Sequence, residues 1–137
     1  MKDPALEPVV NPLSEARRYV DNAKQTLQEH GQLDIKSRLY MDDKYVRSAG
    51  NFLWYAMIIM MDAVFNVKTS HHPHPDINDY KAAVAQRDRK LLAYVVAAYD
   101  TMHISMGYDG NPSKKVCDEG FRLANHIIDR CASMLPS

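Results

Sequence analysis

The most unusual hydrophobic pattern lies between Phe52 and Met61, where ten consecutive residues carry no strongly polar side chain. This run is too apolar for an ordinary surface helix and too short for a membrane span. On a helical wheel of residues 44–67 the polar positions share one narrow stripe, and about 240° of the circumference stays apolar. A helix packed on one side of a small bundle needs an apolar stripe of only roughly 100°. We therefore predict a helix over residues 43–67 that must be covered on more than one side.

Three further segments show the alternating three- and four-residue spacing of amphipathic helices. The first begins at Asn11-Pro12, which provides a cap and a proline at the first helical position, and it ends at Gly31. The second segment ends at Met106. Asn111-Pro112 then gives the same cap and proline signal at the start of the third segment. The apolar positions are Leu13, Ala16, Val20, Ala23 and Leu27 in the first, Leu92, Val95, Tyr99, Met102 and Met106 in the next, and Val116, Leu123, Ile127, Cys131 and Met134 in the last.

The connecting segments are less regular. Asp76, with Asp79 three residues later, predicts the start of a short helix over residues 77–85. A bend at residues 86–88 is expected before the next long helix. Residues 32–43 have a mixed pattern and are interpreted as a loop or short turn, and no segment alternates convincingly enough to predict a β-strand.

Together these elements predict an all-α fold, an antiparallel up-down four-helix bundle with a short extra helix before the third long helix. Residues 1–10 are expected to form a flexible tail, and residues 11–137 a single domain large enough to need no metal or disulfide. Cys117 and Cys131 fall on one predicted helix about 21 Å apart, so they cannot form a disulfide with each other.

Charge and motifs exclude several classes of function. Lysine plus arginine and aspartate plus glutamate number 17 each, so no positive excess favours nucleic acid or an anionic membrane. No run reaches about 18 apolar residues, and the N-terminus lacks the apolar core of a signal peptide. We therefore expect a cytoplasmic protein. No phosphate loop, nucleotide fingerprint, nucleophile elbow or paired-cysteine zinc motif occurs, so we expect no cofactor and assign no catalytic residue.

The histidines offer two candidate metal sites, and neither is favoured. His71, His72 and His74 lie in one loop, but its two prolines restrict the geometry and Asp76 is the one carboxylate nearby. A solvated loop is the preferred interpretation. A site shared by His30, His103 and His126 is excluded by the predicted topology, because His126 lies about 22 Å from the end of the bundle that holds the other two. No metal site is predicted.

His103 is the best candidate for a functional histidine, because it falls on the core side of its helix. It is interpreted first as a core histidine that is satisfied by one hydrogen bond. The alternative is a base in a pocket near the Gly107–Gly110 turn, formed with Tyr99, Tyr108 and Asp109.

Two other sets of polar residues are interpreted as solvated surface. Arg122, His126 and Arg130 form a row on the outer side of the last helix with Glu119 beside it, and a mixed row of this kind is usually exposed rather than an anion site. Asp62 is expected to face solvent on the polar stripe of its helix.

Residues 43–50, 87–94 and 103–111 resemble a family of small helical bacterial proteins known only as a domain of unknown function, and the resemblance covers residues 11–135. Such proteins are broadly similar to the HEPN superfamily of helical bundles, many of which dimerise and some of which cut RNA. The resemblance implies a helical fold and a dimer. The nuclease members carry an arginine, four to six intervening residues and then a histidine. Here three residues separate Arg122 from His126, and no arginine stands at the required distance before His103, so nuclease activity is not expected.

The wide apolar arc of residues 44–67 predicts self-association. One edge of the arc can face the core and the other a second subunit through a two-fold interface. Folding of residues 32–43 over the same surface is the alternative cover. The edges are Trp54, Met57, Met61 and Phe65, which form the candidate dimer face, and Phe52, Ile59 and Ala63.

The functional hypothesis is a non-catalytic, dimeric binding or interaction module, whose partner protein or small ligand the sequence does not identify. The alternative is a small enzyme or HEPN-like nuclease-related protein that uses a pocket near His103.

Overall fold

The computed structural model describes residues 11–69 and 73–136, and this part of the chain is mostly helical with one two-stranded sheet. The elements are, in chain order, α1 (Pro12–His30), β1 (Leu33–Asp34), β2 (Leu39–Tyr40), α2 (Asp43–Val64), α3 (Ile77–Arg87), α4 (Arg89–Ala98), the π-helix η2 (Tyr99–Tyr108) and α5 (Lys114–Ala132).

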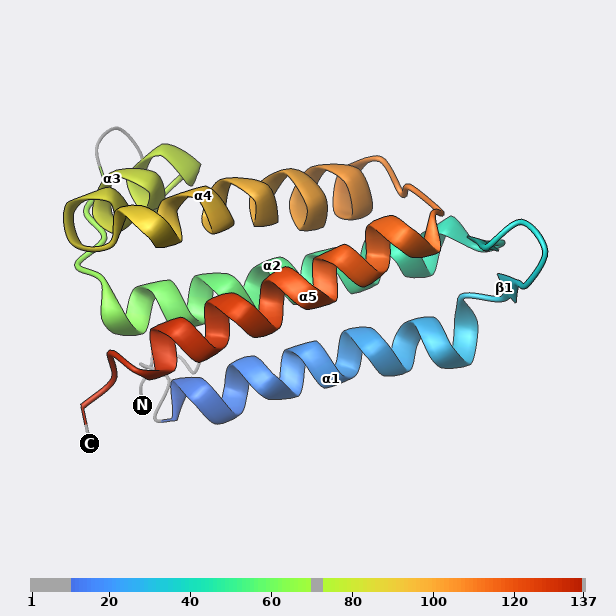
Figure 1. Cartoon of the computed structure of the whole chain (residues 1–137), viewed down its shortest axis with the longest axis horizontal. Coiled ribbons are helices and arrows are strands. Elements are labelled where there is room, and N and C mark those ends of the chain that lie inside the picture. The colour runs from blue at the N-terminus through green and yellow to red at the C-terminus, as the bar shows by residue number, and fades with distance from the viewer. Residues whose placement is uncertain (1–10, 70–72, 137) are drawn as a thin grey trace.

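The long helices α1, α2 and α5 and the continuous rod of α4 and η2 lie side by side (Figure 1). In that view α1 and the continuous rod of α4 and η2 run from left to right, whereas α2 and α5 run back from right to left. The short helix α3 lies at the left-hand end, and the β1–β2 hairpin projects at the right-hand end. The helix α2 contacts α1, η2 and α5, so it is the central element of the core.

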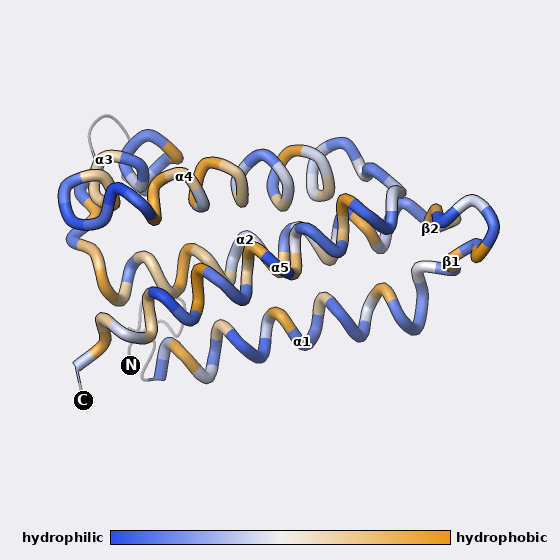
Figure 2. Tube along the Cα trace, in the orientation of Figure 1, coloured by the Kyte–Doolittle hydropathy of each residue, from blue (hydrophilic) through white to orange (hydrophobic). Residues whose placement is uncertain are grey.

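Most of the apolar arc of α2 is covered within the chain itself, although Ala63 is exposed and Phe52 is half-buried. Met57 and Met61 have no exposed surface, and Trp54 and Phe65 are 8% and 5% exposed. This corrects the expectation that these four residues form an uncovered face for a second subunit. The predicted polar stripe is confirmed, because Asn51, Tyr55 and Asp62 are exposed. The neighbouring rods therefore provide the additional cover, and Figure 2 shows how apolar residues concentrate along α2.

Local capping signals explain most of the observed helix starts. The Asn11 side chain accepts a hydrogen bond from the Ser14 amide at 3.0 Å and begins α1. Asp76 and Asp79 form a reciprocal capping box at the start of α3. The predicted bend is a real break at Asp88, which ends α3 after Arg87 and caps α4.

Two predicted helix ends are wrong. The helix α5 begins at Lys114 with Ser113 as its cap, because the Ser113 hydroxyl accepts from the Val116 amide at 3.3 Å. Asn111 instead accepts from the Ser113 amide at 3.0 Å and makes a turn before the helix. At the other end, α2 stops at Val64 rather than residue 67, because Phe65 adopts an extended backbone with φ −114° and ψ 145°.

The π-helix η2 continues α4 and packs against α2 at very short range. A Cβ atom placed on Gly50 would stand 2.5 Å from the Met102 carbonyl oxygen and 2.7 Å from the Gly107 nitrogen. The two backbones therefore touch where α2 has no side chain. The Arg47 guanidinium donates hydrogen bonds to the carbonyl oxygens of Tyr108 and, at 3.2 Å, Asp109, which satisfies the end of η2.

The β1–β2 hairpin, residues 33–40, was predicted as a loop or turn, and its two-residue strands are too short to show an alternating pattern. Leu33 pairs with Tyr40 in an antiparallel register. The hairpin is held to the segment before α5 by main-chain hydrogen bonds, from the Tyr40 amide to the Pro112 carbonyl at 2.8 Å and from the Lys114 amide to the Arg38 carbonyl at 3.0 Å. The loops at this end therefore form one connected unit.

Candidate interaction site

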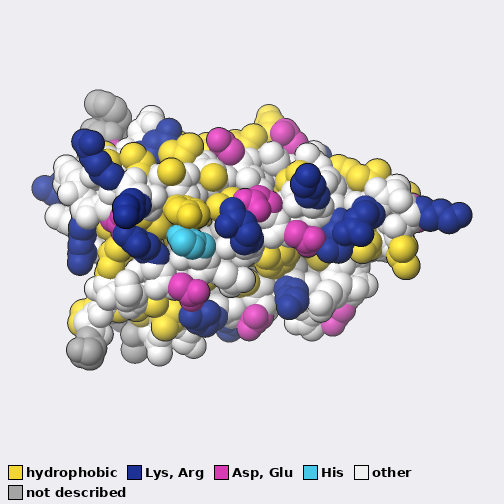
Figure 3. All heavy atoms as spheres, viewed as in Figure 1, with side chains coloured by type: hydrophobic (Ala, Val, Ile, Leu, Met, Phe, Trp, Pro, Cys, Tyr) yellow, Lys and Arg dark blue, Asp and Glu magenta, His cyan; other side chains and the backbone are white. Residues whose placement is uncertain are grey.

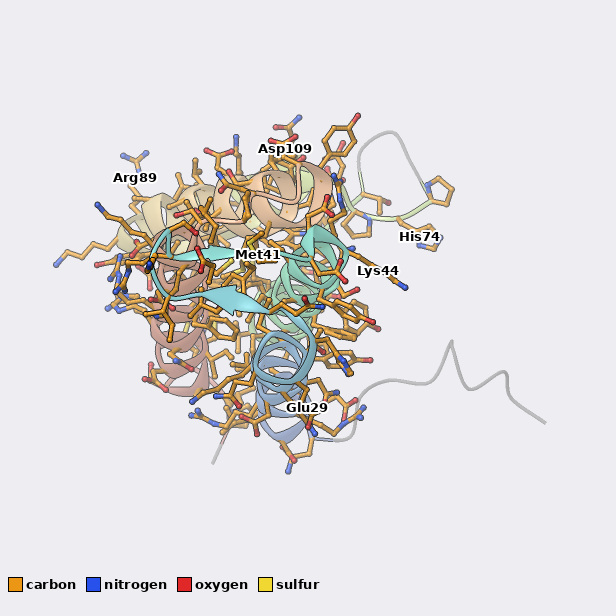
Figure 4. All side chains as sticks on the ribbon, turned by 90° about the vertical axis from the view of Figure 1, so that its right-hand side faces the viewer. Glu29, Met41, Lys44, His74, Arg89 and Asp109 are labelled. Carbon is orange, nitrogen blue, oxygen red and sulfur yellow. The ribbon has the colours of Figure 1, made fainter. Side chains whose placement is uncertain are left out.

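The residues of the proposed His103 pocket do not converge. The rings of Tyr99 and His103 are half-buried with centroids 5.1 Å apart, and the indole of Trp54 lies 6.1 Å from the His103 ring. Tyr108 is 75% exposed, and Asp109, labelled in Figure 4, is also exposed. The structure thus brings Tyr99 and His103 into a small aromatic cluster and leaves Tyr108 and Asp109 at the surface.

The row on α5 is exposed, as predicted, and its residues have partners. Arg122 donates two hydrogen bonds to Glu119 at 2.8 and 2.5 Å, and this contact lowers the pKa of the Glu119 carboxyl. The His126 ring stacks on Tyr94 with centroids 3.9 Å apart. Arg130 donates to Asp88 at 2.7 and 3.0 Å. An anion approaching this row would have to compete with carboxylates that are already bound.

The remaining histidines give no metal centre in the described residues. His71 and His72 lie outside those residues, and His74 is exposed, as Figure 4 shows. His30 stacks on Tyr45 with centroids 4.8 Å apart. Across residues 11–69 and 73–136, no group of three or more histidine, cysteine, aspartate or glutamate side chains is placed to hold a metal ion. The same residues contain no helix long and apolar enough to cross a membrane.

The buried titratable groups are poor candidates for chemistry. Cys117 and Cys131 are free and buried on α5, as expected, and burial raises the pKa of each thiol to about 12. They are therefore protonated at neutral pH, whereas the thiolate is the nucleophilic form. Asp62 is exposed, as predicted, and accepts a hydrogen bond from the Tyr80 hydroxyl at 3.0 Å. Partial burial raises the pKa of the Asp62 carboxyl.

A groove of about 660 Å³ runs between α1 and α5 and is closed at one end by the hairpin. Its volume lies in the range of roughly 300–1,000 Å³ that is typical of ligand sites. Its apolar floor contains Val20, Leu27 and Phe121, and polar side chains surround it. We call this the α1–α5 groove, and its lining is Val20, Asp21, Lys24, Leu27, Gln28, Glu29, Gln32, Leu33, Tyr40, Lys114, Asp118, Phe121 and Asn125.

The hairpin and the residue after it carry the most exposed apolar surface of the described chain. Ile35 is 85% exposed and Met41 66%, and Leu33 and Leu39 are 37% and 39% exposed. The other two exposed large apolar side chains, Tyr55 and Tyr108, lie elsewhere. Helical periodicity does not reveal this surface, because these residues lie outside the helices. The available signal was four large aliphatic residues in a segment without helical periodicity.

These features define a small helical protein with a surface groove and an apolar projection beside it. The family described as a domain of unknown function (DUF5618) matches residues 11–133, so the chain belongs to this family. A solved structure described as a protein of unknown function from Dyadobacter fermentans is similar over 90% of this chain and 96% of its own, with 35% sequence identity and a TM-score of 0.83. No curated protein matches the chain. Neither match bears on the HEPN superfamily, so that resemblance stays a prediction.

Proposed function

We propose that this protein is a non-catalytic, homodimeric interaction module, and that residues 11–137 form one antiparallel up-down four-helix bundle. The observation that carries the proposal is the exposed apolar surface of residues 33–41, which holds four of the six exposed large apolar side chains in the described chain. Clustered exposed apolar surface marks interaction sites more often than scattered single residues do.

The hairpin replaces α2 as the proposed contact surface. The sequence places the dimer face on Trp54, Met57, Met61 and Phe65 of α2, but these four residues are already buried in the core. The hairpin projects at one end of the rods (Figure 1), and Ile35 and Met41 are 85% and 66% exposed, so a partner can cover them without opening the core. Covering apolar area of this kind favours association by roughly 25 cal/mol per Å² before the costs of association are counted.

The enzyme alternative has less support. A pocket base needs polar groups that converge on one cavity. Of the four residues in the His103 hypothesis, Tyr108 and Asp109 face solvent, and the contacts of His103 are to the rings of Tyr99 and Trp54.

We expect sedimentation velocity at micromolar concentration to give a dimer. The double variant Ile35→Asp/Met41→Lys should be monomeric with unchanged helical circular dichroism, because it places charges on the contact surface while the core is untouched. Tyr55→Lys is the matched control, since Tyr55 is 47% exposed on the outer side of α2, and it should remain dimeric. A monomeric wild-type protein would refute the proposal. Loss of the dimer with Tyr55→Lys alone would move the interface to α2.

We also expect no ribonuclease activity above background. Metal-independent cleavage needs an arginine and a histidine that act on one phosphate. Here the Arg122 guanidinium is already bound to the Glu119 carboxylate, which would also repel an approaching phosphate, so the arginine is not free for this task. The measurement is degradation of a labelled RNA in EDTA. Activity lost with both Arg122→Ala and His126→Ala would contradict this prediction, and activity lost with His103→Ala would revive the enzyme alternative.

A further inference from the structure

We propose that in the dimer the hairpin of each copy occupies the α1–α5 groove of the other. This inference rests on the proposed dimer and specifies its contact. The occupant of the groove is thus a second copy of the chain, with Ile35 at the tip of the hairpin as the leading side chain.

The hairpin and the groove form one continuous surface. Leu33 and Tyr40 belong to the hairpin and also line the groove, so the projection lies directly beside the recess. A two-fold interface uses the same patch on both subunits, and that patch must complement itself. A projection and a recess side by side meet this condition, because each copy can insert its hairpin and receive its partner's.

The groove has the size and floor to accept aliphatic side chains. Its 660 Å³ correspond to about 20 water molecules at ~30 Å³ each, which the hairpin would displace. Val20 and Leu27 are buried in its floor, and Phe121 is half-buried. Figure 3 shows apolar side chains both in the seam between α1 and α5 and beside the hairpin at the right-hand end. Contact between these surfaces would take the exposed aliphatic side chains of the hairpin, Ile35 first, out of water against this floor.

The edge of the groove carries a small negative excess. Asp21 and Glu29 line one side together with Lys24, and on the other side Lys114 is paired with Asp118 at 2.6 Å. Because Lys114 and Asp118 neutralise each other, the remaining charges are the carboxylates of Asp21 and Glu29 and the ammonium of Lys24, which leaves a negative excess.

The hairpin turn has the opposite excess. Lys36 and Arg38 are exposed there. Asp34, the acidic residue of the turn, accepts hydrogen bonds from the Ser37 amide at 3.0 Å and from the Ser37 hydroxyl at 2.6 Å. The hairpin of one copy is therefore matched in sign to the groove of another, and complementary charge of this kind selects orientation more than affinity.

The hairpin is also held in its shape by its own hydrogen bonds before binding. Besides the Ser37 contacts, the Arg38 amide donates to the Asp34 carbonyl at 2.8 Å, and Arg38 is held at φ 57°. Non-glycine residues seldom adopt this left-handed backbone, and such conformations persist where the surrounding structure enforces them. A preformed projection loses little conformational freedom on binding, which favours association.

Charge reversal tests the contact. Lys36→Glu/Arg38→Glu on the hairpin and Asp21→Lys/Glu29→Lys on the groove should each weaken homodimerisation at least about tenfold through repulsion between like charges. A mixture of the two variants should form a heterodimer. In it, the basic hairpin of the groove variant meets the native acidic groove of the hairpin variant, and the acidic hairpin of the hairpin variant meets the basic groove of the groove variant. Sedimentation velocity of each variant and of the mixture gives the result. A dimeric wild type whose variants do not pair when mixed would overturn the contact and leave the dimer intact. A monomeric wild type would remove both proposals.

Disulfide trapping locates the contact directly. A copy with Ile35→Cys and a differently tagged copy with Gln28→Cys should form a crosslinked heterodimer under mild oxidation, because Gln28 lines the groove. The native Cys117 and Cys131 are buried and need not be replaced. The matched control pairs Ile35→Cys with Tyr55→Cys and should give no crosslink. Crosslinking between two Ile35→Cys copies in place of the expected pair would show hairpin-to-hairpin contact and overturn the inference.

Discussion

Gly50→Ala should destabilise the protein by about 2–3 kcal/mol. The added methyl group would stand 2.5 Å from the Met102 carbonyl oxygen and 2.7 Å from the Gly107 nitrogen. Both atoms belong to the backbone of η2, so neither can move away without shifting that helix against α2. The gain of about 1 kcal/mol in helix propensity from glycine to alanine is therefore outweighed. Urea unfolding at neutral pH, followed by circular dichroism, gives the difference.

Gly120→Ala is the matched control. Gly120 is also a buried helical glycine, but the nearest atom to an added Cβ is the Met106 sulfur at 2.9 Å, followed by a Leu53 methyl at 3.4 Å. The end of a methionine side chain can rotate away. This variant should therefore stay within about 1 kcal/mol of the wild type. Equal destabilisation by both substitutions would contradict the distinction between backbone and side-chain contacts.

Asp88→Ala should cost about 2–3 kcal/mol, because one carboxylate caps a helix and also binds an arginine. Its side chain is 7% exposed, accepts from the Leu91 amide at 3.1 Å and receives two hydrogen bonds from Arg130 of α5. Removing the carboxylate leaves the first turn of α4 uncapped and removes the hydrogen bonds that Arg130 of α5 donates to the start of α4. The measurement is again urea unfolding, and a loss below about 0.5 kcal/mol would contradict this reading of the structure.

Asp88→Asn separates the two roles of the carboxylate. Asparagine caps a helix as well as aspartate does, so this variant should lose only the charged contact, about 1 kcal/mol. The hydrogen bonds from Arg130 lower the pKa of the folded Asp88 carboxyl below its unfolded value of about 3.9. The contribution of the charge is therefore complete above the unfolded pKa and is lost as the pH falls through the folded pKa. The stability of the wild type and that of Asp88→Asn should begin to converge as the pH falls below ~4 and meet only below the folded pKa, whereas Asp88→Ala should remain less stable at every pH.

Sequence reasoning located elements that have a strong local signal. The caps at Asn11 and Asp76 and the break at Asp88 depend on side-chain contacts within three residues, so the sequence contains all the information needed. At the start of α5, Asn111 and Ser113 are both good caps, and the hydrogen bond from Lys114 to the hairpin favours the later start. The sequence contains no stop signal at Val64.

The candidate site was harder to predict, because it depends on how distant segments pack. A helical wheel shows that Met57 and Met61 are apolar, but not that neighbouring rods cover them. The groove results from the separation between α1 and α5, which no single segment encodes. The π-helix, Tyr99–Tyr108, packs closely against α2 at Gly50, but its residues have an ordinary helical pattern in the sequence.

The main-chain hydrogen bonds that hold the hairpin to Pro112 and Lys114 have an evolutionary consequence. Since backbone atoms make this attachment, the exposed side chains at Ile35, Lys36 and Met41 can be exchanged while the hairpin stays in place. Substitutions in this one short segment should therefore leave the helical scaffold unchanged. Sequence change and lost stability, which commonly accompany each other in proteins, are then separated at this end of the molecule.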